Sequence, residues 1–304
     1  MKILNLEDID PEILRPIYRE TTADVPYCFP VSCDEFKEGL LAPLQQLDNQ
    51  KLVLGQLDGA IVGFAHIALS KQDGQPGLNG SIRFLGYRKG NRPIAQSILE
   101  SAEKYLFDLG IEHIDVPAHN YAFYRFNFGP LSDKMAHICA LLGINGYEPT
   151  GGWLLMELAD YQIEKPIPLA HRIEIAAEVE DTNHRHPNIT IRLLRAGNQI
   201  GLCEASPAGR FHADPSAQDT FYIGWMEVTE SERGRRLGRF LLEATLWEMQ
   251  NRGYNNAVLH TNCGNRRAQL LYAGMGFKVL DTSYEFRKPR PDHRIPQASQ
   301  AKTP

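Results

Sequence analysis

The chain has 304 residues, of which 43% are hydrophobic and 23% are charged, a composition typical of a soluble globular protein. This length suits one large domain or two ordinary domains with sizeable cores. A net charge of −5 disfavours nucleic acid as the main partner, no apolar run approaches the ~20 residues that span a membrane, and the first residues lack the apolar segment of a signal peptide.

The first half of the chain is predicted to mix helices with strands. Asp58-Gly59 suits the tight turn of a hairpin. A stripe of apolar residues three or four positions apart, from Ile94 to Leu109, predicts a helix that Gly110 ends. In chain order, helices are expected at 10–20, 34–47 (with a break at Pro43), 94–110 and 135–142, and strands at 51–56, 60–69, 81–87, 111–116 and 153–158.

The second half is predicted to follow a similar order without a pair of helices at its start. Residues 173–179 suit either a strand or a short helix, because their periodicity does not decide. An apolar stripe from Leu237 to Trp247 predicts a helix that Gly253 ends. The other expected elements are a hairpin at 189–205 turned at 196–198, strands at 220–228, 257–260 and 282–287, and a helix at 266–273.

The two halves of the chain are predicted to repeat one architecture. Fifteen positions separate Ala95 from Gly110, and fifteen separate Gly238 from Gly253. In each half the helix is followed by a strand, a helix and a glycine–aromatic pair, which are Gly146-Tyr147 and Gly276-Phe277. We therefore predict an α/β protein with one domain over residues 1–160, a second over residues 161–288, and a polar, proline-rich disordered tail over residues 289–304.

The turn after the strand at 220–228 has the composition of an anion site. A strand that leads into a helix through small and cationic residues presents free backbone N–H groups and the positive end of the helix dipole, which together bind a pyrophosphate. Gly234 and Gly238 allow close approach of the backbone. The turn's positive charge comes from Arg233, Arg235, Arg236 and Arg239.

This turn and a segment downstream resemble the two motifs of the GNAT superfamily of acyl-CoA N-acyltransferases. The first motif reads Arg/Gln-x-x-Gly-x-Gly/Ala after a strand; Arg233 and Gly238 match it, and Arg236 replaces its first glycine. The resemblance is tight over about a fifth of the chain. Residues that match the second motif, Asn-x-x-Ala, Leu-Tyr and Gly-Phe, are Asn265, Ala268, Leu271, Tyr272, Gly276 and Phe277.

The resemblance implies a fold, a cosubstrate and roles for particular residues. It implies two tandem domains, each with a mixed, mostly antiparallel sheet flanked by helices, and acetyl-CoA or another short acyl-CoA as cosubstrate. Tyr272 would protonate the departing thiolate, as a phenol with a pKa near ~10 can do. The residues expected to bind the cofactor are Met226, Val228, Arg233, Gly234, Arg235, Arg236, Leu237, Gly238, Arg239 and Asn265.

The general base is less determined than the cofactor site. Glu227 on the central strand is the first choice because it adjoins the expected thioester position. Glu204 on the preceding hairpin and His260 at the end of the next strand remain alternatives, and each could act directly or through water. No residue pattern points to a metal site, although His184 and His186 lie close together in a polar loop.

The same turn in the first half departs further from the motif. Gly90 stands at the position of Arg233, and Pro93 at that of Arg236. Proline fits a first helical turn, so the fold can persist there while the phosphate site degenerates. The alternative is that the first half still holds phosphates through Arg88, Lys89 and Arg92.

Two further sets of side chains bear on packing and redox state. A longer loop in the first half carries five aromatic residues, which are expected to pack the halves together rather than line a substrate cleft. Five scattered cysteines, Cys263 among them, predict reduced thiols in a cytoplasmic protein and no covalent catalysis. The five aromatic residues are Tyr121, Phe123, Tyr124, Phe126 and Phe128.

The sequence thus predicts an N-acetyltransferase that joins a short acyl group to a primary amine of a small molecule by direct attack in a ternary complex. Alternatives are a non-catalytic acyl-CoA sensor or scaffold, or acetylation of a protein amine. Some tandem GNAT-like transferases use aminoacyl-tRNA, which the acidic charge disfavours, and the tandem order also resembles mycothiol synthases. A homodimer is possible.

Overall fold

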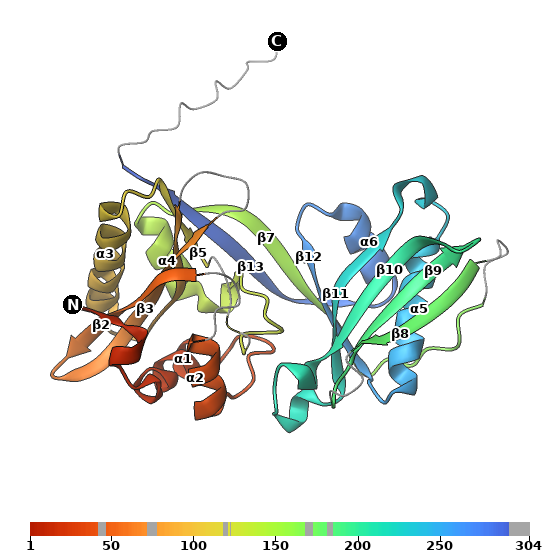
Figure 1. The fold of residues 1–304 in the computed structure, drawn as a ribbon, viewed down its shortest axis with the longest axis horizontal. Helices are drawn as coiled ribbons and strands as arrows, with labels where there is room; N and C mark the ends of the chain where they lie inside the picture. The colour runs from red at the N-terminus through yellow and green to blue at the C-terminus, as the bar shows by residue number, and fades with distance from the viewer. Residues whose placement is uncertain are drawn as a thin grey trace, which may run out of the picture.

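The computed structural model describes residues 1–41, 47–71, 78–117, 121, 123–167, 173–180 and 185–291. It shows two lobes joined by one continuous sheet, with β7 and β13 running between them (Figure 1). None of the helices in these ranges is long and apolar enough to cross a membrane.

The first lobe contains the elements predicted for the first half. Its helix α3 packs directly on the hairpin strands, because Gly55 and Gly63 leave room for Ile94 and Ile98 where a Cβ atom would lie within 3 Å of them. The elements are β1 (Lys2–Asn5), α1 (Arg15–Thr22), α2 (Cys33–Leu41), β2 (Leu47–Leu57), β3 (Ala60–Lys71), β4 (Leu78–Tyr87), α3 (Arg92–Asp108), β5 (His113–Val116), β6 (Leu131–Ser132), α4 (Ala136–Ile144) and β7 (Glu148–Leu158).

The second lobe begins with strands. Residues 173–179, for which the sequence allowed a strand or a short helix, form a strand. No α-helix lies between this strand and β11 within the described residues. The elements are β8 (Ile173–Glu180), β9 (Asn188–Arg195), β10 (Asn198–Pro207), β11 (Thr220–Val228), α5 (Leu237–Asn251), β12 (Asn256–Asn262), α6 (Arg266–Gly274) and β13 (Lys278–Pro289).

The described strands form a mixed, mostly antiparallel sheet, as predicted. Their order is β1-β2-β3-β4-β5-β13-β7-β12-β11-β10-β9-β8, and β6 pairs with β13 off this path. Only β4 with β5 and β11 with β12 pair in parallel. Helices flank each half of the sheet (Figure 1).

The last strand of each half is exchanged between the halves. β7 pairs with β12, from Leu158↔Ala257 to Trp153↔Asn262, whereas β13 pairs with β5. β7 and β13 also pair with each other, at the centre of the sheet. The domain boundary between residues 160 and 161 stays a prediction. The strand pairs β7–β12 and β13–β5 each join residues from opposite sides of this boundary.

Two predictions concern segments at the edges of the described ranges. The expected break at Pro43 lies outside the described residues, and α2 ends at Leu41. The predicted disordered tail begins too early: Pro289 ends β13, and the backbone N–H of Arg290 donates to Glu112 O at 2.7 Å. The rest of that tail, from residue 292, lies outside the described residues.

Each lobe has its own apolar core, and a third cluster joins them. The third cluster is centred on Phe126, Leu155, Tyr222 and Val258. The ring of Phe126, from the first half, stacks on that of Tyr222, from the second half, with centroids 4.9 Å apart and planes 5° apart. The aromatic loop therefore packs the halves together, as its composition predicted.

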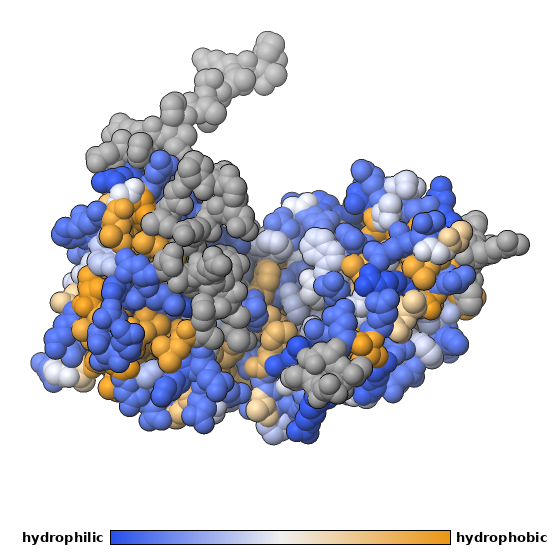
Figure 2. Space-filling view, viewed as in Figure 1, coloured by the Kyte–Doolittle hydropathy of each residue, from blue (hydrophilic) through white to orange (hydrophobic). Residues whose placement is uncertain are grey.

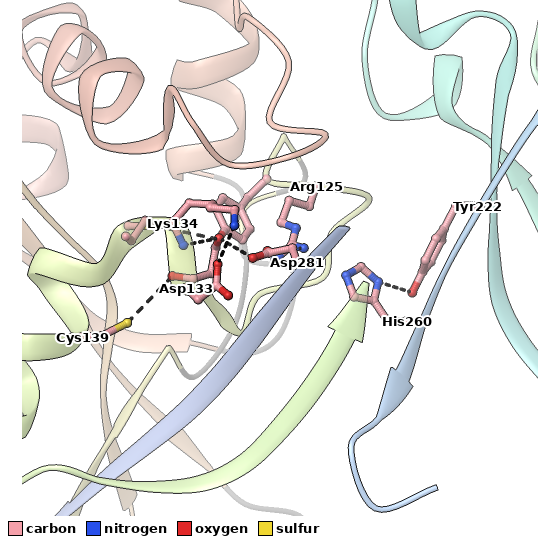
Figure 3. Close-up of polar contacts among 10 residues, drawn as sticks. Arg125, Asp133, Lys134, Cys139, Tyr222, His260 and Asp281 are labelled. Atoms are coloured by element: carbon pink, nitrogen blue, oxygen red, sulfur yellow. Dashed lines mark hydrogen bonds and ion pairs between the residues drawn. The ribbon is translucent and has the colours of Figure 1, made fainter. Parts of the chain in front are cut away.

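A buried ion pair lies beside this third cluster. Arg125 Nη2 is 2.8 Å from Asp281 Oδ2, and both side chains are fully buried (Figure 3). Ser132 Oγ also donates to Asp281 Oδ1 at 3.0 Å. Arg125 belongs to the first half and Asp281 to β13, so the pair links the exchanged strand to the loop that packs against the second half.

Candidate active site

The two parallel strands of the second half separate partway along their length. β11 and β12 pair from Thr220↔Asn256 to Ile223↔Leu259, and beyond these residues each strand continues without the other. At the same point β11 has a bulge at Gly224, because Ile223 and Trp225 oppose consecutive residues of β10. The edge of β11 that faces β12 therefore offers unpaired backbone groups between Gly224 and Val228, except for the carbonyl of Val228, which accepts from Arg233.

The turn after β11 presents a row of free backbone N–H groups. Residues 234–239 donate no backbone hydrogen bond to any described residue, and the first N–H bonded again is that of Phe240, to Arg236 O at 3.1 Å. Gly234 and Arg236 have left-handed backbones, with φ of 82° and 65°. Such alternation turns successive N–H groups toward one concavity, which suits an anion.

Arg236 occupies the N-cap of α5 in this left-handed conformation. Glycine is favoured there because a Cβ atom strains the backbone, which explains why the resembled motif has glycine at this position. The Arg236 side chain is exposed and bonds to no described residue. The departure from the motif is therefore accommodated by a strained backbone rather than by a different turn.

The other arginines of the turn are held by carboxylates. Arg235 lies 3.3 Å from Glu232, and Arg239 lies 2.8 Å from Glu243. Arg233 Nε donates to Val228 O at 3.2 Å, which ties the turn back to the end of β11. These exposed pairs are weak in water, so the guanidinium groups can exchange their partners for phosphate oxygens.

The second motif brings α6 against the start of α5. A Cβ atom on Gly238 would lie 3.5 Å from Leu271 Cδ2, so the two helices meet at this glycine. Asn265 caps α6, because its Oδ1 accepts the N–H of Ala268 at 3.3 Å. The predicted cofactor contact at Gly238 thus lies against α6, and Asn265 at the start of that helix has a structural role as its cap.

Tyr272 lies on α6 with 7% of its surface exposed. Burial raises the pKa of its phenol to about 12, and the thiol of Cys203 adds a smaller effect in the same direction. Its hydroxyl bonds to no described residue. The ring packs against Phe277, with centroids 5.8 Å apart. Tyr272 is thus a neutral phenol with an uncommitted O–H.

The face of β8–β11 opposite α5 carries the first candidate base, and we call it the open face. The register places Trp225 and Glu227 of β11 on this face together with Glu204 of β10, whereas Met226 and Val228 pack into the core with α5. Both glutamates are exposed, and neither bonds to a described residue. Trp225 is not among the site residues predicted from the sequence, although its alternation with the apolar Met226 and Val228 could have placed it on the face opposite the core.

His260 lies on β12 at the separation from β11, but it is enclosed. Its ring stacks on Phe128 at 3.7 Å, and its Nδ1 lies 3.3 Å from the hydroxyl of Tyr222 (Figure 3). Burial, and then the charge of Arg125, lower its pKa well below the usual value. The aromatic rings leave the imidazole little access to a substrate, whereas Glu227 and Glu204 are exposed, so the geometry favours the two glutamates over His260.

The corresponding turn of the first half offers fewer N–H groups. Lys89 N donates to Glu20 Oε1 at 3.3 Å, and the N–H groups of residues 91, 94 and 95 donate to backbone carbonyls. Pro93 has no N–H, which leaves only those of Gly90 and Arg92 without an acceptor in the described part of the chain.

Aromatic side chains also fill the separation of β4 from β5. These strands pair only at Gly80↔Ile114 and Ser81↔Asp115. Beyond that point Tyr121 and Tyr124 leave a cavity of about 20 Å³, which has room for about one water molecule. A cofactor arm does not fit in that space.

Other candidates from the sequence do not form a site. His184 lies outside the described residues, and His186 accepts from Arg210 through its backbone carbonyl. Within the described ranges no group of three or more His, Cys, Asp or Glu side chains is placed to hold a metal ion. Cys263 is a free thiol whose backbone N–H donates to Gly152 O at 2.9 Å.

Comparisons with known proteins agree with this geometry. Residues 155–277 match the model of the acetyltransferase (GNAT) family. This segment includes the separating strands, the turn and both helices of the candidate site. A search of curated proteins gave no match.

Solved structures similar to the whole chain share its fold. One is a tandem GNAT protein from the clavulanic acid biosynthesis pathway, with a TM-score of 0.65 and 13% identity, covering 95% of this chain and 98% of that one. A GCN5-related N-acetyltransferase from Sphaerobacter thermophilus has a TM-score of 0.63 and 15% identity, covering 97% of each chain. A GCN5-related glucosamine N-acetyltransferase region of a fungal multi-domain GH3 β-N-acetylglucosaminidase has a TM-score of 0.66 and 14% identity; the match covers 93% of this chain and 37% of the fungal protein.

Proposed function

Because the chain has the tandem GNAT fold and carries a domain of the acetyltransferase (GNAT) family in its second half, we propose that it transfers a short acyl group from acyl-CoA to a primary amine of a small molecule. The observation that carries this proposal is the run of free N–H groups at residues 234–239, beside the strand edge that lacks a partner. An acyl-CoA presents complementary groups: a diphosphate, and an extended arm with amide groups.

The cofactor is held by the chain in two parts. The N–H groups of residues 234–239 and the side chains of Arg233, Arg235 and Arg239 bind the diphosphate. The unpaired edge of β11, at Met226 and Val228, bonds the amide groups of the pantetheine arm in the manner of an added strand. This alignment brings the thioester to the bulge at Gly224, where the strands separate.

The reaction then needs one base and one acid. Glu227 takes a proton from the substrate ammonium, and the free amine nitrogen attacks the thioester carbon. As the C–N bond forms and the C–S bond breaks, Tyr272 gives its proton to the leaving sulfur and later recovers one from solvent. The second proton on the nitrogen leaves to solvent, so the products are an amide, free CoA and one released proton.

We assign cofactor binding to the second half alone. The first-half turn retains two free N–H groups against six, and the cavity beside its strands is too small for a pantetheine arm. In this account the first half serves the second, by supplying β7 as the partner of β12 and the aromatic loop that encloses His260.

Titration calorimetry with acetyl-CoA tests this proposal on matched variants of the two turns. Arg233→Ala should weaken binding by roughly 10- to 100-fold, because a charge-assisted bond to phosphate contributes ~1.5–3 kcal/mol. Arg92→Ala in the first-half turn should leave the affinity unchanged. Absence of binding at millimolar acetyl-CoA, or an equal loss in both variants, would overturn the proposal.

A further inference from the structure

Trp225 is the most exposed aromatic residue of the proposed active site. It follows the bulge at Gly224 directly, and 55% of its surface is exposed. The neighbouring residue Met226 packs into the core. The strand therefore has a buried side on which an indole could lie, but Trp225 is on the other side. An indole presented to solvent beside the expected thioester is a ready platform for a ligand, above all for a cation.

Two carboxylates flank this indole in a fixed register. Glu204 of β10 lies directly opposite Trp225, and Glu227 lies two residues along β11 on the same face. Cross-strand neighbours in this diagonal relation are ~7–8 Å apart. Neither carboxylate has a cationic partner among the described residues, so both charges are free to attract a ligand.

The rest of the open face has the same sign of charge. By register, Glu174, Glu178 and Glu180 of β8 lie on it and are exposed. Arg192 is the one cation that β8–β11 place on this face in the described chain, and Glu178 binds it at 2.9 Å. An acidic surface around the site favours approach of positively charged acceptors. In the view of Figure 2 the second lobe is mostly hydrophilic.

The reaction itself requires only one of the two carboxylates near Trp225. Glu227 is the base in the proposed mechanism, which leaves Glu204 and the indole without a part in the chemistry. A second positive charge on the acceptor would occupy them, with the two charges separated by a short aliphatic chain. That spacing matches two carboxylates on diagonal positions across a strand pair.

Resting on the function proposed above, we infer that the acceptor is an aliphatic diamine or a longer amine of the same kind. One ammonium group lies over the indole of Trp225 and against Glu204, and it stays charged. The other meets Glu227, loses a proton and attacks the thioester. Trp225 and Glu204 are therefore the residues that select the acceptor.

Steady-state kinetics with three acceptors of similar length test this inference in the full chain. The probes are 1,4-diaminobutane, n-pentylamine and 4-aminobutanoate, each with acetyl-CoA, followed by release of the CoA thiol. We expect kcat/KM to be at least 100-fold higher for the diamine than for the monoamine, and lowest for the amino acid, whose distal carboxylate meets Glu204. Equal values for diamine and monoamine would overturn the inference.

Variants separate the selecting residues from the rest of the site. Glu204→Gln and Trp225→Leu should each raise KM for the diamine by 10-fold or more and bring the ratio of kcat/KM between diamine and monoamine close to one. Glu174→Gln, a carboxylate of the same face on β8, is the matched control and should change neither. If the diamine advantage survives both variants, the inference is wrong. If acetyl-CoA does not bind at all, it is the proposed function that fails.

Discussion

Arg125 and Asp281 form an ion pair that no solvent reaches, although one belongs to a loop of the first half and the other to the last strand of the chain. Removing one partner leaves a buried charge unpaired. Asp281→Ala should therefore lower the free energy of unfolding by about 3–5 kcal/mol. Urea unfolding followed by circular dichroism measures this change.

The control for that variant is a surface ion pair that also joins β13 to the first half. Arg287 of β13 lies 2.6 Å from Asp115 of β5, and the arginine is half exposed. Asp115→Ala should cost no more than ~1 kcal/mol. Equal losses for the two aspartates would show that the buried pair does not hold the exchanged strand.

Arg236→Gly should stabilise the protein. The left-handed backbone at this residue costs a non-glycine side chain roughly 1 kcal/mol, and glycine removes that strain. Because the N–H groups rather than this side chain form the proposed cradle, affinity for acetyl-CoA should fall no more than about threefold. A variant that is less stable than the parent would contradict the assigned strain.

Gly238→Ala should separate stability from binding. The added methyl group meets Leu271 at an ordinary contact distance of 3.5 Å, and alanine favours a helix over glycine by up to ~1 kcal/mol. The Tm of thermal unfolding should therefore be unchanged or higher. In the proposed binding mode the diphosphate lies against the backbone of this glycine, so calorimetry should show affinity for acetyl-CoA reduced by about tenfold or more, ~1.4 kcal/mol. Unchanged affinity would place the diphosphate elsewhere.

Tyr272→Phe should lower kcat by about 100-fold or more with little change in acetyl-CoA affinity. Burial holds the pKa of this phenol at about 12, so the proton it donates is retained well into alkaline solution. The rate should not decline between pH 8 and pH 10 through loss of this acid. Tyr161→Phe is the matched control, because its hydroxyl donates to Leu246 O at 2.9 Å and has no part in the site.

The elements of the fold could be predicted from sequence, but their partners could not. The hairpin turn at Asp58-Gly59 and the helix that ends at Gly110 follow from local chemistry. The exchange of β7 and β13 does not, because a strand has the same alternation whichever neighbour it pairs with. Only the three-dimensional register shows that each half completes the sheet of the other.

Some features of the candidate site could likewise be predicted from the sequence, and others could not. Glycine and arginine at the turn, and the asparagine and tyrosine of α6, point to an acyl-CoA site because their spacing is local. The bulge at Gly224 involves a register with β10 that no local pattern encodes. The enclosure of His260 by Phe128 depends on a loop more than a hundred residues away, so sequence alone left His260 among the possible bases.

Acid should destabilise the protein through its buried histidines. Burial lowers the pKa of His212 to about 4, whereas an unfolded histidine has a pKa of ~6.5. Below pH ~6.5 the unfolded state gains a proton that the folded state resists, so the free energy of unfolding decreases as the pH is lowered. His212 should account for about 3 kcal/mol of that fall by pH 4. Urea unfolding of His212→Gln should show a shallower pH dependence, and an identical slope would contradict this.

The measurement that most directly tests cofactor binding in the second half is amide hydrogen exchange with and without acetyl-CoA. The N–H groups of residues 234–239 lack acceptors within the described structure and should exchange rapidly in the free protein. Acetyl-CoA should protect peptides that cover them and leave peptides over residues 88–95 unchanged. Protection at residues 88–95, or at neither turn under saturating ligand, would contradict the account.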